Sequence, residues 1–165
     1  MKAQINLFSQ VPPTELPPLV SSDAVFERLR PYGSAAREVF LMLSVTSENK
    51  VLKEDVIAVG TVGQCPVYVR ECVRSAIANN ARSVIFAHNH PGGTTSPSKE
   101  DVEITERLAY AFDLMDIQIL DHIIISGEKY FSFADSGQLK QMEHRAKILT
   151  DGVFLTNPLR DVIAK

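Results

Sequence analysis

The sequence predicts an α/β (layered α+β) protein with a mixed central β-sheet flanked by helices. Short apolar runs of strand length alternate along the chain with segments whose apolar residues recur at helical spacing, which is typical of layered folds. Two neighbouring runs, residues 39–46 and 51–60, are separated only by the polar residues 47–50 and therefore indicate a hairpin. With 165 residues, of which 45% are hydrophobic and 22% charged, the chain suits one domain with a sizeable core.

The remaining elements follow in order along the chain. Residues 1–20 contain two Pro-Pro pairs and little periodicity, so we expect an extended or disordered arm that can dock on a neighbour and support a homodimer. Its apolar residues include Ile5, Leu7, Phe8 and Leu19. Ser21 is a suitable N-cap for a short helix that ends at Leu29.

The later part of the chain alternates between segments of strand length and segments whose apolar residues recur at helical spacing. We expect a helix over 69–80, a strand over 83–88, a helix over 98–115, strands over 117–126 and 130–133, and a helix from Gly137 to about Leu149. The expected organisation is an arm over 1–20, a folded domain over 21–140, and the end of the last helix with a tail over 141–165.

Composition and charge restrict the classes of function. The net charge of −3 and the lack of a Lys or Arg run argue against a dedicated duplex-DNA binder, although they leave other nucleic-acid contacts open. No apolar stretch approaches the ~18 residues of a membrane-spanning helix, and the N-terminus shows no signal core, so we expect a cytoplasmic protein. Cys65 and Cys72 are expected to be free thiols, which leaves histidine and carboxylate as metal ligands.

The strongest chemical signal is AHNHPGGTTSPSKED, residues 87–101. His88 and His90 stand at the end of an apolar run with one residue between them. Because residues i and i+2 of a strand point to the same face, the two imidazoles would project together and could share a metal ion. Two loop histidines without a ligand role remain the alternative.

A carboxylate follows in the first turn of the next helix. The apolar stripe of that helix runs through Ile104, Leu108, Phe112 and Met115. Asp101 and Thr105 fall on the same face, and a buried carboxylate is costly unless it is paired or bound to metal. Ser98 and Asp101 also match a capping box, and that pattern taken alone favours helix capping. The two roles are compatible, because Ser98 can cap the helix while Asp101 turns toward a metal.

These residues resemble the JAMM (MPN+) metalloprotease motif, and the chain around them is similar to the RadC-like JAB domain. The similar blocks are GTV at 60–62, PVYVRE at 66–71, AHNHPGG at 87–93, PSKED at 97–101 and LDHIIISG at 120–127. They occur in the family's order over roughly residues 35–135. The resemblance implies a JAB/MPN-like, cytidine-deaminase-like architecture.

The resemblance also implies a set of site residues. It implies a zinc ion (Zn²⁺) bound by His88, His90 and Asp101, with Ser98 assisting at a metal-bound water whose pKa the zinc lowers toward ~7. It further implies a catalytic glutamate just before a core strand, for which Glu38 is the best match. The fallback residues for this role are Glu54, Asp55 and Glu71. His122 is expected to be a satisfied core histidine and not a ligand.

The sequence departs from the family pattern at two positions. Pro-Gly-Gly at 91–93 stands where these proteins usually have Pro-Ser-Gly, and Val69 stands where they usually have proline. Longer family members carry an N-terminal DNA-binding helix-hairpin-helix module, for which residues 1–34 are too few.

The resemblance implies a zinc-dependent hydrolase, a metallopeptidase or isopeptidase acting on a peptide or protein conjugate. The alternative is a non-catalytic RadC-like module that works in DNA repair or mobile-element biology through partners.

Overall fold

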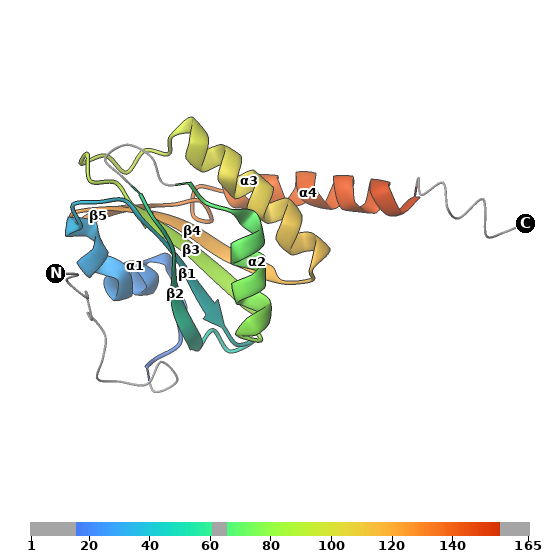
Figure 1. Ribbon diagram of the computed structural model, residues 1–165, viewed down its shortest axis with the longest axis horizontal. Helices are drawn as coiled ribbons and strands as arrows, with labels where there is room; N and C mark the ends of the chain where they lie inside the picture. Colours follow the sequence, from blue (N-terminus) through green and yellow to red (C-terminus); the bar gives the residue numbers. More distant parts are fainter. Residues whose placement is uncertain (1–15, 61–65, 156–165) are drawn as a thin grey trace, which may run out of the picture.

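The computed structural model describes residues 16–60 and 66–155, and it has the mixed α/β architecture that the sequence predicts. Five strands form one sheet in the order β2-β1-β3-β4-β5 (Figure 1). The strands are β1 (Val39–Val45), β2 (Val51–Val59), β3 (Ser83–Asn89), β4 (Gln118–Ser126) and β5 (Lys129–Ser132). Strands β3 and β4 are parallel, whereas the other neighbouring pairs are antiparallel.

Helices cover both faces of the sheet. They are α1 (Ser22–Leu29), the 3-10 helix η2 (Arg30–Ser34), α2 (Val69–Ala78), α3 (Lys99–Leu114) and α4 (Gln138–Leu155). The first two pack on one face, and α2, α3 and α4 pack on the other (Figure 1). Because both faces are covered, every residue of the inner strands β1 and β3 is buried, which explains their uninterrupted apolar runs.

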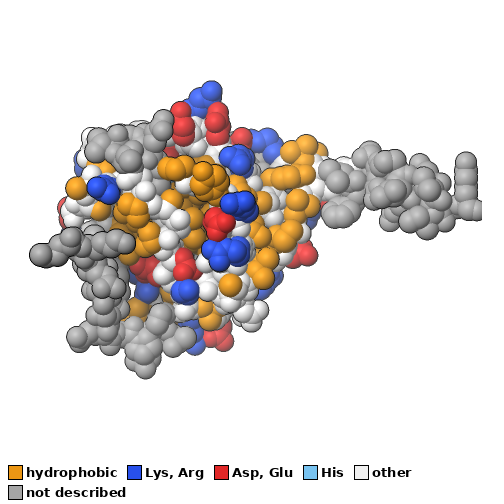
Figure 2. All heavy atoms as spheres, in the orientation of Figure 1, with side chains coloured by type: hydrophobic (Ala, Val, Ile, Leu, Met, Phe, Trp, Pro, Cys, Tyr) orange, Lys and Arg blue, Asp and Glu red, His pale blue; other side chains and the backbone are white. Residues whose placement is uncertain are grey.

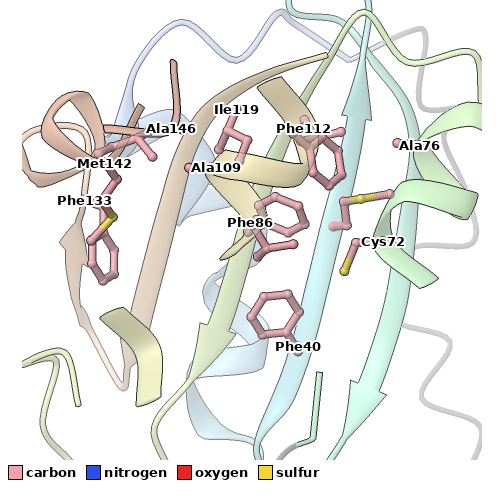
Figure 3. Close-up of a cluster of buried hydrophobic side chains, with 14 of the residues drawn as sticks. Phe40, Cys72, Ala76, Phe86, Ala109, Phe112, Ile119, Phe133, Met142 and Ala146 are labelled. Carbon is pink, nitrogen blue, oxygen red and sulfur yellow. The ribbon is translucent and has the colours of Figure 1, made fainter. Parts of the chain in front are cut away.

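The larger core lies between the sheet and α2, α3 and α4. Phe40 of β1 and Phe86 of β3 project from the same face of the sheet toward Phe112 of α3 (Figure 3). The rings of Phe86 and Phe112 meet edge to face with centroids 5.4 Å apart, a favourable aromatic geometry. This packing holds α3 against the face of the sheet that carries Phe40 and Phe86.

The last helix is longer than the sequence suggested. We expected it to end at about Leu149, whereas α4 continues to Leu155. Its buried residues recur at helical spacing, and the last of them lies just beyond the expected end: Leu139, Met142, Ala146 and Thr150. The Thr150 hydroxyl donates a hydrogen bond of 2.6 Å to Asp113 of α3, so contact with α3 supports the additional turn.

Two further expectations are corrected by the packing. Met115 does not belong to the buried stripe of α3, because the helix ends at Leu114 and Met115, its C-cap, is 46% exposed. Leu19, expected in the arm, is buried in this chain's own core, and its N–H donates to the carbonyl oxygen of Asn49. Ile5, Leu7 and Phe8 of the expected arm, together with Cys65, lie outside the described residues.

The surface of the described part mixes both signs of charge. On the face shown in Figure 2, acidic and basic side chains are interspersed among hydrophobic ones. None of the helices within residues 16–60 and 66–155 is long and apolar enough to cross a membrane.

The strand directions bring the predicted site residues to one end of the sheet. Because β1 and β3 are antiparallel, Phe40 near the start of β1 pairs with His88 near the end of β3. Glu38 lies two residues before Phe40, and α3 begins at this same end after the loop that follows β3. The fold therefore places Glu38, His88, His90 and Asp101 in one region.

The 3-10 helix η2 passes so close to the end of β4 that only glycine fits at position 33. A Cβ atom on Gly33 would lie 2.6 Å from the carbonyl oxygen of Gly127. The N–H of Gly127 in turn donates a 3.1 Å hydrogen bond to the carbonyl oxygen of Gly33. This contact anchors the segment that leads into β1 and thus to Glu38.

Replacement of this glycine tests the close contact. We expect Gly33→Ala to lower the free energy of unfolding by about 1–3 kcal/mol, because an added methyl group overpacks the contact. Gly92→Ala is the control, since nothing lies within 4 Å of its Cβ position. That variant should change stability by less than about 0.5 kcal/mol. Urea unfolding measures both, and equal stabilities of the two variants would contradict the contact.

Candidate metal centre

Three potential metal ligands converge from two elements. His88 belongs to β3, His90 follows directly after this strand, and Asp101 lies in the first turn of α3. One ligand atom from each side chain lies within 4.8 Å of the others. The His88 Nε2 atom is 3.0 Å from His90 Nε2 and 2.9 Å from Asp101 Oδ1, and His90 Nε2 is 3.3 Å from Asp101 Oδ2. The cluster contains the three residues predicted from the sequence and could bind a metal ion.

Hydrogen bonding prepares His90 to act as a ligand. Its Nδ1 atom lies 3.0 Å from the carbonyl oxygen of Thr94. A carbonyl oxygen only accepts, so Nδ1 carries the ring proton. The neutral ring then presents a lone pair on Nε2, the atom that faces His88 and Asp101. This orientation is the one that a metal-binding imidazole needs.

His88 is held by a second histidine. Its Nδ1 atom lies 2.9 Å from Nε2 of His122, whose Nδ1 atom lies 2.7 Å from Oγ1 of Thr105. The expectation that His122 is a satisfied core histidine is confirmed: its side chain is fully buried, both ring nitrogens have partners, and it lies outside the ligand cluster. Burial lowers the pKa of His122 well below its ordinary value, so the ring is neutral.

The capping box at the start of α3 orients Asp101. Both the N–H and the hydroxyl of Ser98 donate to Asp101 Oδ2, each at 2.7 Å, while the N–H of Asp101 donates to Ser98 Oγ at 3.1 Å. The predicted capping is thus confirmed. Because Oδ2 accepts the capping hydrogen bonds, Asp101 Oδ1 stays directed at His88. The capping box therefore also places the carboxylate as a potential ligand. The role of Ser98 at a metal-bound water, which the resemblance implies, stays a prediction.

The electrostatics of the cluster favour a bound cation. Burial alone would raise the pKa of Asp101, but the hydrogen bonds that His88 and His90 donate when Nε2 carries a proton outweigh it and hold this pKa well below its usual range. A bound metal ion would replace these Nε2 protons. The hydrogen bond with Asp101 raises the pKa of His90. A buried carboxylate therefore faces two imidazole nitrogens, a donor set that suits a divalent metal.

Glu38 lies beside this cluster, directly before β1, and is partly buried. Burial raises the pKa of its carboxyl group; His88 and His90 oppose the rise, and Asp101 adds to it. The carboxyl group is thus close enough to interact electrostatically with all three potential ligands. A raised pKa also suits a carboxylate that must accept a proton near neutral pH.

Asn89 fixes the segment that carries Glu38. Its buried side chain accepts a 2.8 Å hydrogen bond from the N–H of Val39. The same amide donates to the carbonyl oxygens of Ala35 and Arg37 at 3.2 and 3.0 Å. The backbone is therefore held on both sides of Glu38. Sequence reasoning missed Asn89, although strand alternation between His88 and His90 places it on the opposite face and was an available signal.

The fallback acids have other partners. Glu54 accepts from Arg28 at 3.2 Å and from the Tyr32 hydroxyl at 2.9 Å. Asp55 accepts from Ser75 and Asn79, each at 2.6 Å. Glu71 forms ion pairs with Arg70 and Arg74 on α2. These contacts favour Glu38 over the fallbacks as the acid associated with the cluster.

Comparison with known proteins agrees with this geometry. The family model of the RadC-like JAB domain matches residues 19–138. A UPF0758 protein of Pseudoalteromonas translucida is 48% identical over 101 residues, which cover 61% of this chain and 45% of that protein. A UPF0758 protein of Cupriavidus pinatubonensis is 45% identical over 105 residues, covering 64% of this chain and 46% of the relative.

A third relative is shorter. UPF0758 protein YeeS of Escherichia coli is 42% identical over 103 residues, which cover 62% of this chain and 70% of YeeS. The chain spans about half the length of the first two relatives. The match to the family model includes Glu38 and all three potential ligands, and it confirms the resemblance seen in the motifs. The chain belongs to the RadC-like JAB domain family.

Proposed function

We propose that this protein is a zinc-dependent hydrolase that cleaves an amide or isopeptide bond in a peptide or protein conjugate. The observation that carries the proposal is the convergence of two imidazole nitrogens and a buried carboxylate beside a second carboxyl group with a raised pKa. Three protein ligands leave one position of a tetrahedral zinc ion for water or substrate, as in catalytic zinc sites. The proposed place of action is the cytoplasm.

The proposed reaction assigns a task to each side chain. Zinc held by His88, His90 and Asp101 would supply a Lewis acid that polarises the scissile carbonyl group and acidifies a water molecule. The Glu38 carboxylate accepts the proton that the water loses and returns it to the nitrogen of the leaving amine. Asn89 keeps Glu38 in reach by holding the backbone on either side of it.

Ser98 would contribute a hydrogen bond to the developing oxyanion. Its hydroxyl donates to Asp101 Oδ2 at 2.7 Å, so this task requires the hydroxyl to rotate away from Asp101. The N–H of Ser98 also donates to Asp101 Oδ2 at 2.7 Å, so the carboxylate keeps one of its two donors during the rotation. Donors directed at a developing oxyanion are worth about 2.7–4 kcal/mol of transition-state stabilisation.

The first prediction concerns metal content. Purified protein supplemented with zinc should contain about one zinc per chain, and His88→Ala and Asp101→Ala should lose most of it, because each removes one of three ligands. His144→Ala is the control, because His144 is exposed on α4. Elemental analysis after gel filtration measures the metal. Wild-type protein without stoichiometric zinc would refute the proposed function.

The second prediction concerns the base. Glu38→Gln should retain zinc but lose about 10²–10⁴-fold in hydrolysis rate, because the amide cannot accept the proton. Glu71→Gln is the matched control, since Glu71 pairs with arginines on α2. Rates are measured on a panel of fluorogenic peptide and isopeptide substrates. Full activity of Glu38→Gln would reject Glu38 as the base, and a zinc-loaded wild type that cleaves no member of the panel would favour the non-catalytic module.

A further inference from the structure

We propose that Thr105 and His122 are positioning residues that fix the metal-binding tautomer of His88. The inference rests on the proposed metal site and extends it to residues that do not touch the metal. Three consecutive hydrogen bonds carry it, from Asp101 through Thr105 and His122 to His88. Each contact has only one chemically allowed donor once the first is assigned.

The chain of donors begins at Thr105. Its Oγ1 atom lies 2.5 Å from the backbone carbonyl oxygen of Asp101, one turn earlier in α3. A carbonyl oxygen has no proton, so the hydroxyl proton of Thr105 points to Asp101. A hydroxyl has one proton only, and Thr105 Oγ1 therefore acts as acceptor in its other contact.

That other contact determines the tautomer of His122. Its Nδ1 atom lies 2.7 Å from Thr105 Oγ1, so Nδ1 carries the proton and donates it. A second proton on this ring would place a charge at a fully buried position, which is costly. Nε2 of His122 is therefore an acceptor.

The last contact determines which ring nitrogen of His88 carries the proton. Nε2 of His122 lies 2.9 Å from Nδ1 of His88, so His88 donates through Nδ1. The one proton of a neutral, metal-binding His88 ring is then the one on Nδ1, which leaves Nε2, 2.9 Å from Asp101 Oδ1, as the metal-binding atom. A histidine protonated on Nε2 could not bind metal through this atom. The hydroxyl of Thr105 thus selects the tautomer of His88 through two successive hydrogen bonds, with His122 between the two residues.

Aromatic packing keeps His122 in this orientation. Its ring stacks on Phe133 at a centroid distance of 5.1 Å and meets the edge of Phe40 at 5.4 Å. Phe86 lies on a further side, with its centroid 6.3 Å away. The apolar surroundings leave the two ring nitrogens to Thr105 and His88.

The test is the affinity for zinc alone, measured by competition with a chromophoric chelator. Thr105→Val replaces the hydroxyl by a methyl group of similar size and should weaken zinc binding about 10–100-fold, the usual effect of losing a partner behind a metal ligand. Thr105→Ser retains the hydroxyl and should bind zinc nearly as tightly as wild type. Thr150→Val is the matched control, because its buried hydroxyl bonds Asp113 on α3. It should bind like wild type.

A second pair of variants keeps the test decisive if Thr105→Val does not fold. His122→Gln supplies an amide oxygen that can accept from His88 and an amide nitrogen that can donate to Thr105, whereas His122→Leu supplies neither. We expect His122→Gln to bind zinc more tightly than His122→Leu. Equal affinities in this pair would overturn the inference, as would a Thr105→Val affinity equal to that of Thr150→Val.

A spectroscopic measurement reads the tautomers directly. Long-range ¹H–¹⁵N correlation spectra of zinc-loaded, ¹⁵N-histidine-labelled protein should show His88 and His122 protonated on Nδ1. A proton on Nε2 of His122 would overturn the inference. These outcomes are distinct from a failure of the proposed metal site. That site is refuted only if the wild-type protein binds no zinc.

Discussion

The site depends on a buried and ionised carboxylate. An isolated carboxylate inside a protein is strongly disfavoured, so Asp101 requires compensation from every side. Its Oδ2 atom receives two hydrogen bonds from Ser98, its Oδ1 atom faces His88, and its backbone carbonyl oxygen receives the hydroxyl of Thr105. The helix N-terminus adds a favourable dipole. These contacts join the start of α3 to the end of β3, and the other parts of the site are organised around this junction.

At the end of β3, the alternation of side chains between the two faces of the strand gives neighbouring residues different roles. His88 and His90 project toward Asp101, whereas Asn89 between them projects to the opposite side and holds the backbone around Glu38. Three consecutive residues thus place the potential ligands and the proposed base relative to each other. The antiparallel pairing of Phe40 with His88 makes this possible, because it brings the start of β1 to the end of β3. A shift of register by one residue would exchange the two faces and separate ligands from base.

The parts of the site that follow from local periodicity could be predicted from the sequence. The two-residue period of a strand pairs His88 with His90, and the helical period with the capping pattern turns Asp101 inward. Asn89 and Thr105 were not recognised as site residues. Their partners, at Ala35, Arg37, Val39 and His122, are brought close only by the folded sheet and helix packing. His122 was predicted to be buried and satisfied, yet its partners depend on the parallel pairing of Phe86 with His122. The length of α4 was also underestimated, because contact with α3 supports its later turns.

The central claim is that one metal ion lies between β3 and α3. Diffraction from zinc-supplemented crystals, recorded on both sides of the zinc absorption edge, tests it most directly. The account predicts one anomalous peak at ~2.0–2.1 Å from Nε2 of His88 and of His90 and at ~2.0–2.2 Å from a carboxylate oxygen of Asp101. A stoichiometric zinc ion bound elsewhere, or one coordinated through His122, would contradict it.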